Sequence, residues 1–302
     1  MIKEQLDRLR VPVVISLALG LIASAIIIGL RSAGFFQFVE LATYDIYLRL
    51  KEQHSLAEPR VVLVQTIEPD IQKLGEWPLT DSRMAETLKK LLAHEPRAIG
   101  VDLYRDIPVA PGTDELNSLL TSEKRVFIIE KFGTDESNHV SGPAVLQGTG
   151  QIGFADVPVD DDGVVRRGLL FLDDGENFSV SLALRLVMTY LAAEGITPQA
   201  GIPNPEHIRL GQVTFPPFEA NDALYVDADD RGYQYILDFK GGASRFKTYS
   251  LSDVLEGRVD PNVIKDNVVI FGVNAESVKD LSLIHISEPT RLNSTSRMPS
   301  SA

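Results

Sequence analysis

The stretch Val61–Ile67, VVLVQTI, decides the fold of this chain. Its apolar residues follow one another almost without interruption and show no helical period. Short apolar runs of this kind are typical of strands that are buried on both faces of a parallel sheet. The sequence therefore predicts a buried parallel strand at 61–67.

The next segments supply the connection that a parallel sheet needs. An amphipathic pattern at 80–94 predicts a helix, and Ala98–Leu103, AIGVDL, predicts a second buried strand. Strand, helix and strand in this order predict a right-handed crossover, with the two strands parallel and adjacent. A predicted helix at 113–122 and a predicted strand at 126–130 continue the α/β alternation.

The second half of the chain has shorter predicted elements. The sequence places Asp162-Gly163 in the acidic turn 160–163 between apolar runs, which is typical of a hairpin. Neighbouring residues on a strand face opposite ways, so only one of Arg166 and Arg167 is expected to point toward a cleft, with the other in solvent. The remaining predicted elements are strands at 151–158, 164–172, 208–215, 233–239 and 267–273, helices at 180–191 and after Ser250, and a loop at 198–205.

Together these elements predict one mixed, largely parallel α/β sheet flanked by helices, within residues 54–281. The length of 302 residues and the 44% hydrophobic content allow a sizeable core. The net charge of −13 argues against a nucleic-acid partner, because a polyanion is repelled by such a surface. The absence of cysteine excludes disulfides and suits a bacterial periplasmic domain.

A membrane span is predicted ahead of this domain. Residues Val11–Leu30, VPVVISLALGLIASAIIIGL, contain no ionisable side chain and would extend ~30 Å as a helix. The flank at 1–10 carries Lys3, Arg8 and Arg10, so we expect it in the cytoplasm and the main domain outside the inner membrane. The alternative is a cleaved signal peptide with its cleavage site at 23–25, although the apolar run continues beyond that site.

Residues 31–53 are predicted to continue this helix outward as a juxtamembrane stalk. Apolar residues recur there at steps of three and four, which is typical of one helical face. Such a face would fit a signalling stalk and a homodimer contact, or a helix that packs on its own domain. The residues of this face are Phe36, Val39, Thr43, Ile46 and Leu50.

The chain changes character after Leu281. Residues 282–302 have no apolar period, and LSLIHISEPTRL resembles the translation of a sequencing adaptor. We therefore expect an artefactual tail on a protein truncated near Asp280. An ordinary disordered, serine-rich tail is the alternative.

Known catalytic and metal-binding patterns are absent from the sequence. No P-loop, nucleophile elbow or H-E-x-x-H motif occurs, and the histidines are isolated, so neither a cofactor nor a metal is predicted. Residues 227–238 resemble a calcium loop only superficially, because Arg231 occupies a ligand position. Two alternatives to a sensor remain: a membrane-anchored hydrolase or transferase that uses Asp102 and Asp106, and a structural envelope protein.

The order of several short stretches resembles the type-2 CHASE family, which comprises extracytoplasmic sensory domains of bacterial cyclases, histidine kinases and Ser/Thr kinases. The resemblance covers residues 44–281 and implies a non-enzymatic input domain whose cytoplasmic output domain is missing from this chain. The matching stretches are YDIYLRL from Tyr44, VVLVQTIEPDIQKLGEWPL from Val61, AIGVDLYRD from Ala98, DDDGVVRRGLL from Asp160, YILDFKGG from Tyr235, YSLSDVLEG from Tyr249 and NVVIFGVNAESVKDL from Asn267.

Polar side chains follow the predicted strands at 61–67 and 98–103. In parallel sheets ligands bind beyond the carboxyl ends of strands, so these residues predict a cleft for a small polar molecule or an envelope ligand. The alternative is that Trp77 caps the core and Asp102 accepts backbone N–H bonds in its loop. If the cleft lies elsewhere, the end of the last predicted strand near Asn274 and Lys279 is the next candidate. The predicted ligand-binding residues are Glu68, Asp70, Trp77, Arg83, Asp102 and Asp106.

Overall fold

The computed structural model describes residues 2–51, 59–133, 139–173, 175, 178–239 and 245–278. The chain divides into two compact units. The N-terminal unit comprises Met1–Lys51 and Phe218–Asp230, and the sheet unit comprises Glu52–Pro217 and Arg231–Ala302. The predicted tail at 282–302 lies outside the described residues.

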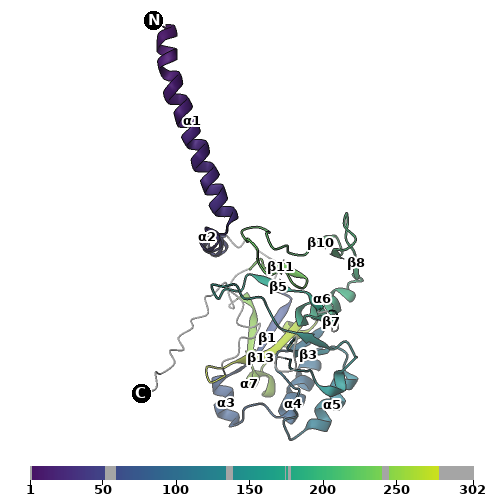
Figure 1. Cartoon of the computed structure of the whole chain (residues 1–302). Helices are drawn as coiled ribbons and strands as arrows, with labels where there is room; N and C mark the ends of the chain where they lie inside the picture. Colours follow the sequence, from purple (N-terminus) through teal and green to yellow (C-terminus); the bar gives the residue numbers. More distant parts are fainter. Residues whose placement is uncertain are drawn as a thin grey trace. The chain divides into compact units, whose positions relative to one another are not determined.

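A parallel sheet forms the centre of the sheet unit (Figure 1), and its strand order is β12-β1-β13-β2-β3-β4. Each neighbouring pair is parallel, and the middle of β1 is buried as its apolar sequence predicts. The predicted fold class, a largely parallel α/β sheet flanked by helices, is therefore confirmed. The strands are β12 (Lys247–Ser250), β1 (Val61–Ile67), β13 (Val268–Asn274), β2 (Ala98–Val101), β3 (Val126–Glu130) and β4 (Ile152–Phe154).

Strand β13 lies between β1 and β2. It pairs with β1 from Val61 opposite Val268 to Ile67 opposite Asn274, and it pairs with β2 along its other edge. The prediction that β1 and β2 are adjacent is therefore wrong, although they do run parallel. A crossover rule relates the directions of two strands and leaves room for a third strand between them. Strand β13 comes from a distant part of the chain. Its apolar residues suit the centre of the sheet, where a strand is buried on both faces.

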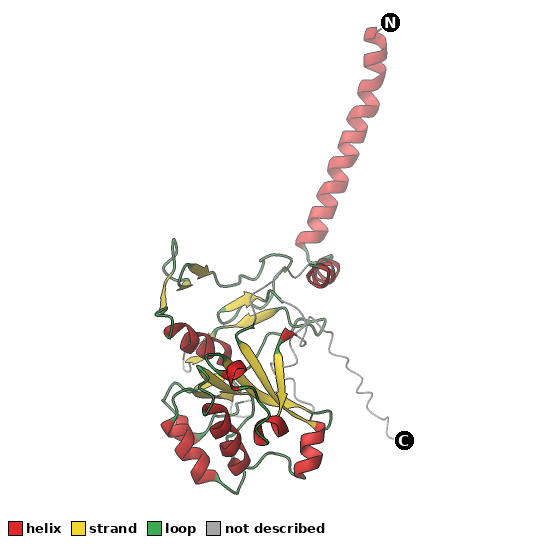
Figure 2. Cartoon of the chain, turned by 180° about the vertical axis from the view of Figure 1, so that it is seen from behind, coloured by secondary structure: helices red, strands yellow, loops and turns green. Residues whose placement is uncertain are grey.

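Helices cover one face of the sheet and enclose the main hydrophobic core (Figure 2). In α4, Met84, Leu88 and Leu91 recur at steps of four and three and are fully buried against the strands. Burying each such side chain contributes roughly 1.5–3 kcal/mol before entropy is considered. The helices on this face are α3 (Glu68–Leu74), α4 (Asp81–Leu92), α5 (Thr113–Ser122), α7 (Leu251–Leu255) and α8 (Pro261–Ile264).

Helix α6 (Leu182–Ala192) packs on the opposite face of the sheet. Its Leu186 lies so close to the sheet that a Cβ atom at Gly100 would be 2.7 Å from the leucine Cδ1. The helix begins later than the predicted residue 180 because Ser181 is its N-cap, and the serine hydroxyl accepts a hydrogen bond from the amide of Leu184 at 3.2 Å. Gly100 therefore permits close packing of α6 on β2.

The turn at 160–163 is present, but the predicted hairpin is not. Gly163 has a φ of 77°, and its amide donates to the carbonyl of Asp160 at 2.8 Å. The strands on either side pair elsewhere: β4 pairs with β3, and β5 (Arg167–Leu169) pairs with β11 (Gln234–Ile236). A favourable turn sequence therefore bent the chain without determining which strands pair.

Short antiparallel pairs complete the sheet unit. Strand β6 (Phe171–Asp173) pairs with β7 (Phe178–Val180), and a small sheet has the order β10-β9-β8. The predicted loop at 198–205 therefore contains a strand, and the predicted strand at 208–215 is a hairpin instead. These elements are β8 (Pro198–Ala200), β9 (Ile208–Leu210), β10 (Val213–Phe215) and the 3₁₀ helix η1 (Ala144–Leu146).

The N-terminal unit begins with α1 (Ile2–Ser32), which contains Pro12–Ser32 as a stretch long and apolar enough to cross a membrane. This stretch overlaps the predicted span. Contrary to prediction, the helix does not run on toward residue 53, which lies outside the described residues. Gly34, with a φ of 75°, ends α1, and α2 (Gln37–Leu50) begins after a turn.

One face of α2 packs against the segment Phe218–Asp230. Leu41 is buried with Phe218 and Tyr225, whose rings meet edge to face at 5.2 Å between centroids. The amide of Val226 also donates to Gln37 Oε1 at 2.7 Å. Of the two interpretations left open by the sequence, the described residues support a helix that packs on its own chain.

Replacing Gly163 tests the turn separately from side-chain packing. No atom lies within 4 Å of a Cβ built at Gly163, so Gly163→Val introduces backbone strain without a clash. We expect a loss of roughly 1–3 kcal/mol in the free energy of unfolding, measured by urea denaturation. Gly163→Asn is the control and should lose much less, because asparagine tolerates positive φ. Equal losses in both variants would show that strain at this φ is not the cause.

Candidate functional site

The carboxyl ends of the parallel strands meet at one edge of the sheet, as in other α/β folds. Polar residues occupy this edge at the end of each central strand. Glu68 follows β1, Asn274 ends β13, Asp102 follows β2 and Glu130 ends β3. The predicted ligand-binding residues therefore belong to loops and helices at this edge.

Asp70 is a structural connector at the edge. The side chain is 2% exposed, and one carboxylate oxygen accepts the amides of Ile67 and Leu251 at 3.1 and 3.2 Å. The other oxygen accepts the amide and hydroxyl of Ser252. Asp70 therefore joins the start of α3 to the start of α7, where a carboxylate also offsets the partial positive charge of the helix end.

Glu68 holds the segment that leaves the central strand. Its carboxylate accepts the amide of Ser277 at 3.1 Å, and hydrogen bonding by Ser277 lowers the pKa of Glu68. Beside it, Asn274 Nδ2 donates to Gln65 Oε1 at 3.2 Å. The end of β13 is thus tied to the end of β1 by side chains as well as by the strand ladder. Lys279, named as an alternative site residue, lies outside the described residues.

The loops that follow β1 and β2 meet, although their strands are not neighbours. Buried Arg105, from the loop after β2, donates to the carbonyl of Leu79. Asp81, at the start of α4, accepts the amide of Val109 at 3.0 Å and the hydroxyl of Thr113 at 2.8 Å. Arg105 Nε lies 3.8 Å from Asp81 Oδ1, and burial lowers the pKa of Arg105.

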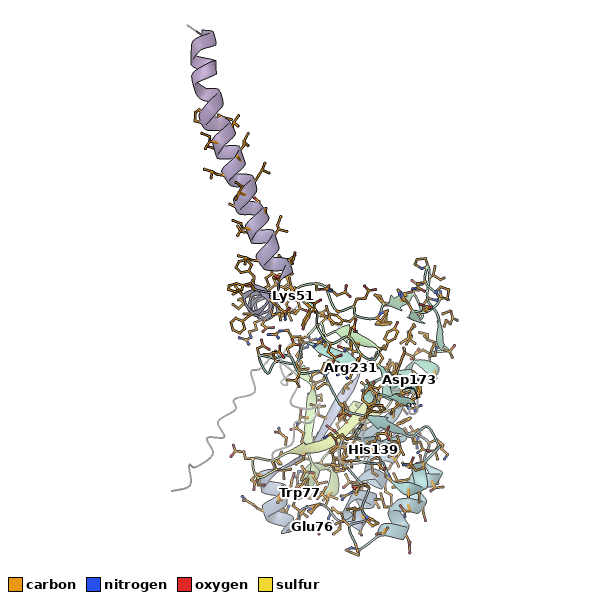
Figure 3. All side chains as sticks on the ribbon, in the orientation of Figure 1. Lys51, Glu76, Trp77, His139, Asp173 and Arg231 are labelled. Carbon is orange, nitrogen blue, oxygen red and sulfur yellow. The ribbon has the colours of Figure 1, made fainter. Side chains whose placement is uncertain are left out.

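Trp77 and Arg83 belong to the first of these loops and to α4. Trp77 is partly buried and packs against the main core, and Figure 3 shows it beside Glu76. Arg83 lies 3.5 Å from Glu76 and 2.7 Å from Glu86, so its charge is already partly balanced. Both residues remain partly exposed, which leaves room for contact with a ligand.

Asp102 and Asp106 have different surroundings despite their closeness in sequence. Asp102 is 2% exposed, and its amide donates to the carbonyl of Phe271 on β13 at 2.7 Å. Asp106 is exposed to solvent. Asp102 thus belongs to the buried sheet edge and is held there through its backbone, whereas Asp106 faces solvent.

Arg105 and Asp81 are not among the ligand-binding residues predicted from the sequence. The structure assigns both to the contact between the two loops. Two further polar groups lie at the β3–β4 end: Ser179 donates to Glu130, and burial raises the pKa of Asp156. Only a tertiary structure could have found these pairs, because their members are far apart in sequence.

The prediction for Arg166 and Arg167 is wrong, because both are buried. Arg166 is 1% exposed and contacts Asp160 at 2.7 Å and Asp162 at 2.6 Å. Arg167 contacts the second oxygen of Asp160 at 2.8 Å, and it also donates to Gln234. The carboxylate of Asp160 thus pairs with both arginines, and neither arginine is exposed to solvent. Removing one member would leave a buried charge unpaired.

Within the described residues, no group of three or more histidine or acidic side chains is arranged to hold a metal ion. The candidate site consists of hydrogen-bonding and charged side chains around two loops. Such a set can hold a polar ligand by hydrogen bonds and ion pairs without covalent chemistry.

Comparison with protein families supports a sensory class of protein. A family model for the CHASE2 domain matches residues 22–300. The chain therefore belongs to the CHASE2 domain family, whose members are extracellular sensory domains of signal-transduction proteins. No curated protein and no solved structure matches this chain.

Replacing Asp70 tests its structural role at the sheet edge. Asp70→Asn keeps the shape but places an amide NH₂ against backbone donors, so we expect a loss of about 1–3 kcal/mol in unfolding free energy. Asp106→Asn is the matched control at an exposed position, and it should stay within about 0.5 kcal/mol of the parent. Thermal or urea denaturation measures both. A loss for Asp106→Asn as large as that for Asp70→Asn would contradict the role given to Asp70.

Proposed function

We propose that this chain is the ligand-sensing input of a bacterial transmembrane signalling protein. The observation that carries the proposal is membership of a family of extracellular sensory domains. In this proposal Pro12–Ser32 anchors the chain in the inner membrane, with residues 1–10 in the cytoplasm and the sheet unit in the periplasm. The cationic residues ahead of the span support this orientation.

The proposed ligand site is the carboxyl edge of the sheet, around the loops after β1 and β2. Trp77 offers a partly exposed aromatic face and Arg83 a partly exposed cation. Asp106 supplies an exposed carboxylate from the second loop. These groups suit a small polar molecule, since an aromatic face and opposite charges can orient it together. Glu68, Asp70 and Asp102 would then support the site from behind.

The proposed signal passes through the end of the central strand. Glu68 binds the amide of Ser277, and Gln65 accepts from Asn274, so the chain leaves β13 through contacts at the same edge. A ligand that competes for these groups would favour a different position of the segment after β13. Such a ligand shifts the equilibrium only as far as its affinities for the two positions differ.

The output that this input would drive is proposed from the family resemblance. It is a cytoplasmic adenylate or guanylate cyclase, a histidine kinase or a Ser/Thr kinase. A hydrolase or transferase that uses Asp102 and Asp106, and a structural envelope protein, are the competing functions. Turnover of a substrate, lost on Asp106→Asn, would favour the enzyme over the sensor.

Reporter fusions test the proposed orientation. Alkaline phosphatase, which is active only outside the cytoplasm, and green fluorescent protein, which fluoresces only within it, are fused in turn after Leu281. We expect phosphatase activity and no fluorescence, because residues on the far side of the span should be exported. The same fusions after Arg10 are the control and should give the opposite pattern. Fluorescence after Leu281 would contradict the proposal.

A further inference from the structure

The face of α2 that does not pack on the chain is strongly apolar. Val39, Ile46 and Leu50 lie on the side opposite Leu41 and Leu48, which are buried in the same helix together with Asp45. Phe38 lies three residues before Leu41, at the border between the packed side and the exposed side. The term "exposed α2 face" denotes Phe38, Val39, Ile46 and Leu50, whose exposed fractions are 61%, 59%, 54% and 76%. Phe35, in the turn just before α2, is 76% exposed as well. A contiguous apolar face of this kind marks a contact with something other than water.

The end of α1 lies close to the start of α2. The amide of Phe35 donates to the carbonyl of Leu30 at 3.0 Å, so the turn folds back on the last turn of α1. Arg31 also forms an ion pair with Glu40 at 2.8 Å. Arg31 is the first charged residue after the apolar stretch, and charged residues at such a position lie at the level of the lipid headgroups. Glu40, and with it the first turn of α2, lies beside that residue.

The direction of α2 also suits the plane of a membrane surface. In Figures 1 and 2, α1 is seen from the side while α2 is seen nearly along its axis, so α2 runs across the direction of α1. A helix that crosses a span at its end lies along the membrane surface rather than away from it. Amphipathic helices in this position bury their apolar face about 5–10 Å into the boundary between headgroups and acyl chains.

The packed face of α2 shows which way the helix is turned. It contacts the segment Phe218–Asp230, which is rich in carboxylates. Carboxylates avoid the hydrocarbon layer, so this segment belongs on the water side of α2 and the exposed α2 face belongs on the lipid side. The carboxylates are Glu219, Asp222, Asp227, Asp229 and Asp230.

We propose that α2 is an interfacial helix whose exposed face, Phe38, Val39, Ile46 and Leu50, inserts into the outer boundary of the lipid bilayer. This inference rests on the proposed membrane span in α1. In this arrangement the lipid surface holds α2 at a fixed depth, and the segment Phe218–Asp230 is held there with it. The chain would then contact the membrane along α2 as well as through the span in α1.

Fluorescence quenching of single-cysteine variants tests this proposal. The chain has no cysteine, so each variant carries one label at one place. Val39→Cys and Ile46→Cys report on the exposed α2 face, and Ile26→Cys, 57% exposed, reports on the span. Val213→Cys is the control for an exposed apolar residue on a hairpin, with 56% exposure. Each full-length variant is labelled with bimane and reconstituted into phosphatidylcholine–phosphatidylglycerol vesicles.

The expected quenching of each label depends on the depth of that label in the bilayer. Lipids with a nitroxide near the headgroup should quench labels at 39 and 46, lipids with a nitroxide deep in the acyl chain should quench the label at 26, and aqueous iodide should quench only the label at 213. Iodide quenching at 39 and 46 equal to that at 213, with lipid quenching retained at 26, would overturn the interfacial helix alone.

Two further outcomes would also overturn it. Protection of 39 and 46 from both lipid and iodide, together with disulfide cross-linking of Ile46→Cys between chains, would assign the face to a second copy of the chain. A label at 26 that no lipid quenches would remove the proposed membrane anchor and the interfacial helix with it. The quenching at position 26 therefore separates failure of the inference from failure of the proposed function.

Discussion

The backbone ladder between β13 and β1 is the interaction on which the sheet unit depends. Residues Val268–Asn274 pair in register with Val61–Ile67, and the other edge of β13 pairs with β2. Parallel strands cannot be joined by a tight turn, so β13 reaches the centre of the sheet through a long connection that contains the intervening helices and strands. The end of this central strand lies at the same edge as the candidate site. A change at that edge therefore acts on the strand that joins the two sides of the sheet.

The polar residues at this edge divide into supports and contacts. Asp70 and Arg105 are buried and hold backbone groups of neighbouring loops, so their charges are used within the fold. Trp77 and Arg83 are partly exposed, and Asp106 is exposed. A ligand would meet the exposed residues first, while the buried residues keep the loops in place. A rigid support beneath adaptable contacts is what a binding site on loops requires.

Local sequence patterns predicted several helices and strands well, but they did not predict which distant strands pair. The apolar runs at 61–67 and 126–130 and the helix at 113–122 agree with the structure residue for residue, because burial on one or two faces leaves a local period in the sequence. The place of β13 and the partners of β5 depend on contacts between distant segments, which leave no such period. The pairing of Asp160 with Arg166 and Arg167 is local, six and seven residues along the chain, and it escaped prediction because β5 begins only at Arg167, so strand alternation does not govern the pair. The family resemblance was stronger evidence of function than any single motif, because it used the order of many short stretches.

The central claim is that the carboxyl edge of the sheet binds the ligand, and Trp77 tests it most directly. It is the chain's one tryptophan, so its emission reports on this edge alone. The protein is screened against small polar molecules by thermal denaturation, and each compound that raises the melting temperature is then titrated while Trp77 emission is recorded. The account predicts a saturable change in emission with the same concentration dependence as the rise in melting temperature. A compound that raises the melting temperature and leaves Trp77 emission unchanged would place the site elsewhere in the chain.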